Sequence, residues 1–110
     1  NYDSASVKSA CEVLESGGLP TRLVIDCSHG NSNKDHERQP LVFEDVVNQR
    51  ATGNSNIVGI MLESNINPGS QSLGKDPDSL EYGVSITDAC VGWEKTEDII
   101  VWADSRLNES

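Results

Sequence analysis

Three polar side chains in this chain are of types that can bind a divalent metal ion: His29, Glu63 and Asp88. His29 and Glu63 each follow a short apolar run that is typical of a buried strand, and Asp88 follows a long loop after the second run. If these runs are strands of one sheet, the three side chains reach the same end of that sheet. One imidazole and two carboxylates form a ligand set for a divalent metal. A catalytic metal usually has a further ligand, and the sequence offers no obvious fourth.

The composition argues against two other classes of partner. The chain has 110 residues, with 18 Asp and Glu against 8 Lys and Arg, and a formal net charge of -10. Binding of nucleic acid or of an anionic membrane surface needs a basic patch, so we expect neither. No apolar run approaches the roughly 20 residues that span a bilayer. The first residues also lack the basic and apolar stretches of a signal peptide.

Three cysteines, Cys11, Cys27 and Cys90, are widely spaced, and no Cys-x-x-Cys pair occurs. An odd number at these spacings indicates no disulfide framework. We therefore expect a reducing, cytoplasmic location, with the three thiols buried and unreactive.

Hydrophobic periodicity predicts three helices, near residues 5–16, 40–51 and 96–107. Pro40 fits the first turn of the second helix, where its missing N–H costs nothing. Thr96 is the expected N-cap of the third helix, because acidic residues follow it directly.

Two strands are expected near residues 22–27 and 57–63, where the apolar runs are too short for helices. Continuous β-branched runs of this kind predict strands that are buried on both faces of a parallel sheet. Gly59 is expected to let a neighbouring side chain approach closely. Residues from about 65 to 84 show no period, and a loop of that length is usually functional or disordered.

The predicted order is helix, strand, helix, strand, long loop and helix, which indicates an α/β fold. Two parallel strands alone leave both sheet edges unpaired, so residues 1–110 are expected to be a single fragment of something larger. The natural whole is a (β/α)8 TIM barrel, whose active site lies at the carboxyl ends of its strands.

Three segments closely resemble type I 3-deoxy-D-arabino-heptulosonate-7-phosphate (DAHP) synthases. They are residues 25–32 (IDCSHGNS), 59–65 (GIMLESN) and 82–94 (YGVSITDACVGWE). The resemblance runs in order across nearly the whole chain. It implies the C-terminal part of the barrel of an enzyme that condenses phosphoenolpyruvate with erythrose 4-phosphate. That reaction is metal-dependent and is the first step of the shikimate pathway to aromatic amino acids.

The resemblance also implies a ligand set, because the family holds its metal with Cys, His, Glu and Asp. The His of the Ser-His motif falls on His29, the Glu of the Met-x-Glu-Ser motif on Glu63, and the Asp of the Ser-Ile-Thr-Asp-Ala-Cys motif on Asp88. Nothing in the chain matches the family's Cys or its basic phosphate-binding residues. The metal could be Mn, Fe, Co or Zn. Asp26 is either an outer-shell partner of His29 or a plain turn residue.

Alternatives remain open at this point. His29 could be a loop histidine bonded to a neighbouring carbonyl. The chain could be a non-catalytic fragment that folds by self-association, as a homo-oligomer, or by complementation with another fragment. A generic acidic metal-binding module is disfavoured by the register of the three segments. We expect the isolated chain to bind metal weakly and to be inactive, because nothing in it positions a substrate.

Overall fold

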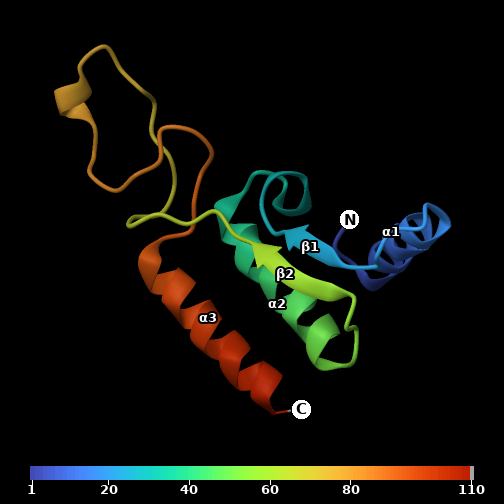
Figure 1. Ribbon diagram of the computed structural model, residues 1–110. Coiled ribbons are helices and arrows are strands. Elements are labelled where there is room, and N and C mark those ends of the chain that lie inside the picture. Colours follow the sequence, from blue (N-terminus) through green and yellow to red (C-terminus); the bar gives the residue numbers. More distant parts are fainter. Residues whose placement is uncertain (110) are drawn as a thin grey trace.

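The structure is a computed structural model that describes residues 1–109. It contains helices α1 (Ser4–Ser16), α2 (Gln39–Ala51) and α3 (Trp93–Asn108), strands β1 (Leu23–Asp26) and β2 (Ile57–Met61), and the 3-10 turns η1 (His29–Ser32), η2 (His36–Arg38) and η3 (Pro77–Ser79) (Figure 1). The α/β class and the predicted order of three helices and two strands are therefore confirmed.

The two strands pair in parallel, with Leu23 opposite Ile57 and Asp26 opposite Met61. The Cys27 N–H donates to the Met61 carbonyl at 2.8 Å, so both strands end together. Gly59 permits this pairing, because a Cβ added there would lie 3.2 Å from a methyl group of Val24. The close approach expected at Gly59 is thus present.

The core lies where the two strands meet α2, which runs behind them in Figure 1. Four residues of α2 at helical spacing are buried there: Val42, Phe43, Val46 and Val47. α1, α3 and both strands add the remaining members of the core: Val7, Cys11, Ile25, Cys27, Ile57, Ile99 and Ala103. Burial of each such valine or isoleucine side chain stabilises the fold by about 1.5–3 kcal/mol.

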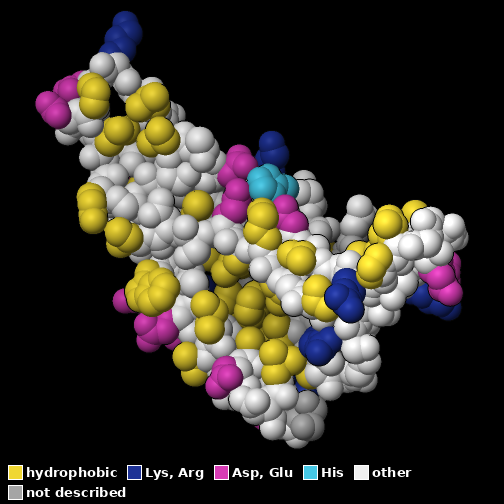
Figure 2. Space-filling view, viewed as in Figure 1, with side chains coloured by type: hydrophobic (Ala, Val, Ile, Leu, Met, Phe, Trp, Pro, Cys, Tyr) yellow, Lys and Arg dark blue, Asp and Glu magenta, His cyan; other side chains and the backbone are white. Residues whose placement is uncertain are grey.

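The prediction that both strand faces are buried is wrong. Ile25 is 6% exposed but Val24 is 66% exposed, and Ile57 is 3% exposed but Val58 is 56% exposed. The helices cover one face of the sheet, and within residues 1–109 each strand has only one neighbouring strand. The other face therefore stays open, and Figure 2 shows apolar side chains at the surface of this part of the molecule.

The third helix begins earlier than predicted, at Trp93, and Thr96 is buried inside its first turn. The Thr96 hydroxyl donates to the Gly92 carbonyl at 2.8 Å and lies 2.6 Å from the Ser64 hydroxyl. A threonine that bonds the carbonyl four residues earlier is satisfied within a helix, so it does not have to cap one.

The segment between β2 and α3 projects from the rest of the molecule (Figure 1). Isolated bridges hold it together, pairing Ser64 with Val91, Gly69 with Cys90 and Ser70 with Ser85. The residues before α3 are thereby brought back to the end of β2. Among the helices of residues 1–109, none is long and apolar enough to cross a membrane.

Replacing Gly92 by alanine should destabilise this return of the chain. The added Cβ would lie 2.9 Å from Cδ and 3.2 Å from N of Pro68, whose ring cannot rotate away. We expect a loss of about 1–3 kcal/mol in the free energy of unfolding, measured by urea denaturation. Gly74→Ala is the matched control, because its nearest neighbour is the Ser79 hydroxyl at 3.9 Å. An equal loss in both variants would contradict this account.

Candidate metal centre

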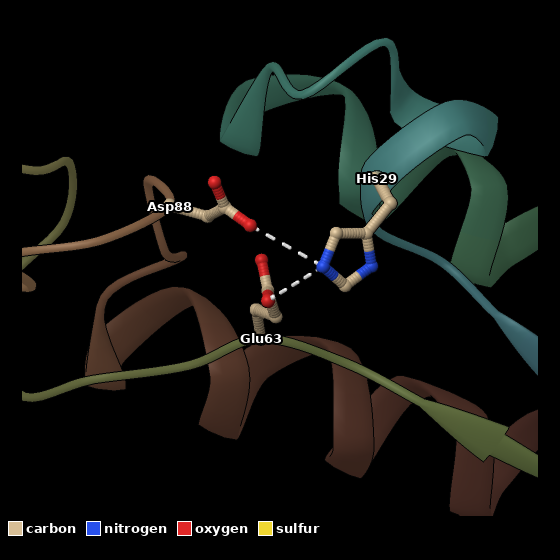
Figure 3. Close-up of side chains that lie close together, drawn as sticks. All are labelled: His29, Glu63 and Asp88. Atoms are coloured by element: carbon tan, nitrogen blue, oxygen red, sulfur yellow. Dashed lines mark ion pairs between the residues drawn. The ribbon is translucent and has the colours of Figure 1, made fainter.

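His29, Glu63 and Asp88 meet at the carboxyl end of the sheet, where their side chains point toward one another (Figure 3). His29 opens η1 just after β1, Glu63 lies two residues beyond β2, and Asp88 lies in the segment that returns to α3. The parallel pairing of the strands explains why the first two meet, and the bridged loop explains why the third joins them. The structure thus brings together all three residues that the sequence singled out.

The donor atoms of this group are close. His29 Nε2 lies 3.2 Å from Glu63 Oε1 and 3.3 Å from Asp88 Oδ2. One ligand atom from each residue lies within 4.8 Å of the other two. All three side chains are partly exposed. The group can therefore be reached by an ion from solvent.

The other nitrogen of His29 is held by Asp26. The distance from His29 Nδ1 to Asp26 Oδ2 is 2.9 Å. Ser28 fixes the same carboxylate, since its backbone N–H donates to Asp26 Oδ1 at 2.8 Å and its hydroxyl at 2.5 Å. Asp26 therefore makes the contact expected of an outer-shell partner, and it directs Nε2 toward the two other carboxylates.

The backbone of His29 is left-handed, with φ 53°. This conformation is uncommon outside glycine, although histidine adopts it more readily than most residues. Neighbouring bonds hold the turn: the Asn31 amide donates to the Asp26 carbonyl and the Lys34 N–H donates to the His29 carbonyl, both at 2.7 Å. The strained backbone is thus fixed by the same short segment that orients the imidazole.

The carboxylates shift the proton affinity of the imidazole. The hydrogen bond to Asp26, followed by the charge of Glu63, raises the pKa of His29 above its ordinary value. Partial burial works to raise the pKa of Asp26, but hydrogen bonds from Ser28 and His29 outweigh it and the pKa is lowered. His29 is therefore the group at which a proton and a metal ion would compete.

The donor set fits a divalent metal. Two atoms that each lie about 2.1 Å from one ion are roughly 3.0 Å apart at a right angle and roughly 3.4 Å apart at a tetrahedral angle. The two distances from His29 Nε2, 3.2 and 3.3 Å, fall within that range. One imidazole nitrogen with two carboxylate oxygens suits Mn, Fe, Co or Zn. The separations between His29 Nε2 and each of the two carboxylates therefore suit ligation of a single ion.

No cysteine belongs to this group within residues 1–109. Cys27 is fully buried, and burial raises its pKa to about 12. Cys90 is partly buried, its thiol contacts the Asp88 carbonyl at 3.6 Å, and burial raises its pKa as well. Both thiols thus favour the protonated form, which is a poor metal ligand. Cys11 is buried and free, as is Cys27.

Two residues that bond to members of the group were not anticipated: Ser28 donates to Asp26, and the Gln39 side-chain oxygen accepts from the Glu63 backbone N–H. Ser28 follows Asp26 by two positions, a spacing at which an aspartate commonly accepts hydrogen bonds from the following backbone. Gln39 shares a helical stripe with Val42, Phe43 and Val46, so it is a polar residue where an apolar one is expected. A polar residue at an apolar position of a helix is the feature from which a buried hydrogen bond of Gln39 could have been predicted.

Comparison with known proteins shows the family to which this chain is similar. Residues 1–101 match the model of the DAHP synthetase I family. A Tyr-sensitive phospho-2-dehydro-3-deoxyheptonate aldolase of Escherichia coli is 49% identical over 108 residues, covering 98% of this chain and 30% of that protein. A tyrosine-inhibited aldolase of the same name from Schizosaccharomyces pombe is 52% identical over 99 residues, covering 87% of this chain and 27% of that protein.

A solved structure of a protein with the same name is also similar to this chain. The phospho-2-dehydro-3-deoxyheptonate aldolase of Francisella tularensis matches with a TM-score of 0.90 and 36% identity, covering 98% of this chain and 31% of that one. The chain thus spans about 30% of the length of the Escherichia coli and Francisella tularensis proteins. Since the family model covers all but the last residues, the chain belongs to the DAHP synthetase I family.

Proposed function

We propose that this chain supplies three ligands of the metal centre of a DAHP synthase, His29, Glu63 and Asp88. The complete enzyme would condense phosphoenolpyruvate with erythrose 4-phosphate and release phosphate, the first step of the shikimate pathway. The observation that carries the proposal is the convergence of three residues from three separate family segments, at distances of 3.2 and 3.3 Å from one imidazole nitrogen.

The residues at this centre would have different roles. His29 offers Nε2, Asp26 and Ser28 hold the imidazole ring in place, and the two carboxylates offset the charge of a divalent ion. The bound ion would act as a Lewis acid toward the aldehyde carbonyl of erythrose 4-phosphate. The donor set admits Mn, Fe, Co or Zn.

We further propose that β1 and β2 are neighbouring strands of a (β/α)8 barrel. The parallel pairing, the open sheet face and the position of the centre at the carboxyl ends of the strands support this assignment. Substrates that carry phosphate need basic residues, and the chain is strongly acidic. The phosphate-binding groups would therefore come from the rest of the enzyme, and this chain alone would not turn over.

A second candidate function is that of a non-catalytic fragment that associates with another chain. Val24 and Val58 are apolar side chains of the two strands that stay 66% and 56% exposed. Each strand also has one unpaired edge within residues 1–109. Such edges favour pairing with a further strand, either from a second copy or from a complementary fragment.

Metal binding tests the first proposal directly. We expect Mn²⁺ to bind the purified chain saturably, and His29→Ala or Glu63→Ala to lower the affinity by more than the roughly 10–100-fold that loss of an outer-shell partner costs. Isothermal titration calorimetry measures this. His36→Ala is the matched control, because His36 lies in η2 outside the group. Binding that is unchanged in the first two variants would contradict the assignment.

The affinity for Mn²⁺ should rise with pH. A proton and the ion compete for Nε2, and the pKa of His29 is raised, so the proton is held to a higher pH than in a free histidine. Binding should therefore weaken as the pH falls through a midpoint above the ordinary value of about 6.5. Asp26→Asn removes the main cause of the shift and should move that midpoint down. An affinity that does not vary between about pH 5 and about pH 9 would refute this explanation.

The size of the chain in solution tests the second candidate. We expect light scattering to report a mass above the 11.9 kDa of one chain, because the open sheet face attracts a second copy. Val24→Ser with Val58→Ser should shift the mass toward the monomer. Val13→Ser is the control, since Val13 is 69% exposed but lies on α1. A monomer at all concentrations would count against association.

A further inference from the structure

Gln39 is a buried polar residue in the core that the proposed chemistry leaves unexplained. It is the first residue of α2 and is only 1% exposed, yet its neighbours along the helix stripe are apolar. A neutral amide in such a place is costly unless it is hydrogen-bonded. Its side-chain oxygen accepts a hydrogen bond from the backbone N–H of Glu63 at 3.0 Å. The one polar group that α2 brings to this end of the core therefore contacts the backbone of a metal-centre residue.

The Glu63 N–H lies beyond the last pairing of the sheet. β2 ends at Met61, whose carbonyl accepts from Cys27, and Glu63 follows two residues later. Without Gln39 this partly buried donor would have no partner among the described hydrogen bonds. Loss of a partner for a buried donor is unfavourable, so the backbone would move to find another. Gln39 thus fixes the position at which the chain leaves the sheet.

The carbonyl of Glu63 is held from the opposite direction. It accepts from the Val91 N–H at 3.0 Å, and the Val91 carbonyl accepts from the Asn65 N–H at 3.0 Å. Val91 is 2% exposed and lies three residues after Asp88. The peptide groups on both sides of Glu63 are therefore clamped between α2 and the segment that carries Asp88.

Gln39 also directly follows the segment that carries His29. Residues 29–38 form η1 and η2 and lead directly into α2, and η1 packs against α2. The N-terminal end of α2 is consequently tied both to the loop of His29 and to the backbone of Glu63. A shift there would change the separation of the imidazole from both carboxylates.

We propose that Gln39 is a positioning residue for the metal centre, acting on Glu63 through its backbone N–H. This inference rests on the proposed function, because it assumes that Glu63 is a ligand. Gln39 itself does not contact the ion. Its role differs from that of the adjacent core valines, which stabilise the helix without bonding to Glu63.

The experiment compares Gln39→Met with Val42→Ala. Methionine keeps the approximate length and volume of the side chain, but its thioether sulfur is a much weaker hydrogen-bond acceptor than the amide oxygen. Val42 is 2% exposed in the same helix, so its truncation disturbs the core without removing that bond. Thermal unfolding of the metal-free chain and calorimetric titration with Mn²⁺ are measured for both variants, with His29→Ala alongside. We expect Gln39→Met to lower the Mn²⁺ affinity roughly 10-fold or more, and Val42→Ala to change it less than about 2-fold at a similar loss of melting temperature.

The possible results separate the two proposals. Binding by the unmodified chain that is lost in His29→Ala but unchanged in Gln39→Met would overturn the positioning role alone. An equal loss of affinity in Gln39→Met and Val42→Ala would overturn it too, because a general loss of packing would then explain both. Failure of the unmodified chain to bind Mn²⁺ would overturn the expectation that these three residues bind the ion within this chain alone, and the positioning role in this chain with it.

A second measurement needs no variant and guards against misfolding of Gln39→Met. In the isotope-labelled, metal-free chain, nuclear magnetic resonance can detect a scalar coupling across a hydrogen bond. We expect such a coupling between the Glu63 amide nitrogen and the side-chain carbonyl carbon of Gln39. Its absence, together with rapid exchange of the Glu63 amide proton with solvent, would overturn the contact on which the inference depends.

Discussion

The parallel pairing of β1 with β2 is the constraint on which the candidate centre depends. With Asp26 opposite Met61, both strands end at one edge of the sheet. A one-residue slip would turn every side chain of one strand to the other face. It would also change how far Glu63 lies from His29. Gly59 keeps this register possible because a larger residue would press on Val24. The close packing of Val24 on Gly59 therefore affects the distance between Glu63 and His29.

Electrostatics at the centre favours a cation. Three carboxylates, those of Asp26, Glu63 and Asp88, surround a single imidazole. The hydrogen bond to Asp26, followed by the negative charge of Glu63, raises the pKa of His29, so the imidazole holds a proton more tightly than a free histidine does. In the proposed centre, a divalent ion would replace that proton. The imidazole would then be both a ligand and the group whose protonation opposes binding.

The open face of the sheet follows from its size, because two strands and the helices on one side leave the other side uncovered. α2 covers one side of the sheet, and the exposed valines on the other side have no cover within residues 1–109. In relatives about three times as long, additional chain is available to cover such a face. Under the proposed function, the acidic charge of this chain would mean that the basic groups that bind phosphate substrates are not among residues 1–109.

The element order, the family and the three residues of the candidate centre could be predicted from the sequence, because periodicity and motifs are local properties of the chain. Contacts between residues that are distant in sequence could not, because they depend on how the elements pack. Val24 and Val58 look like core residues in the sequence, but burial depends on which strands are present. Thr96 looks like a helix cap, yet Gly92 and Ser64 satisfy its hydroxyl inside the helix. Gln39 contacts Glu63 across 24 residues, and no local pattern specifies that hydrogen bond.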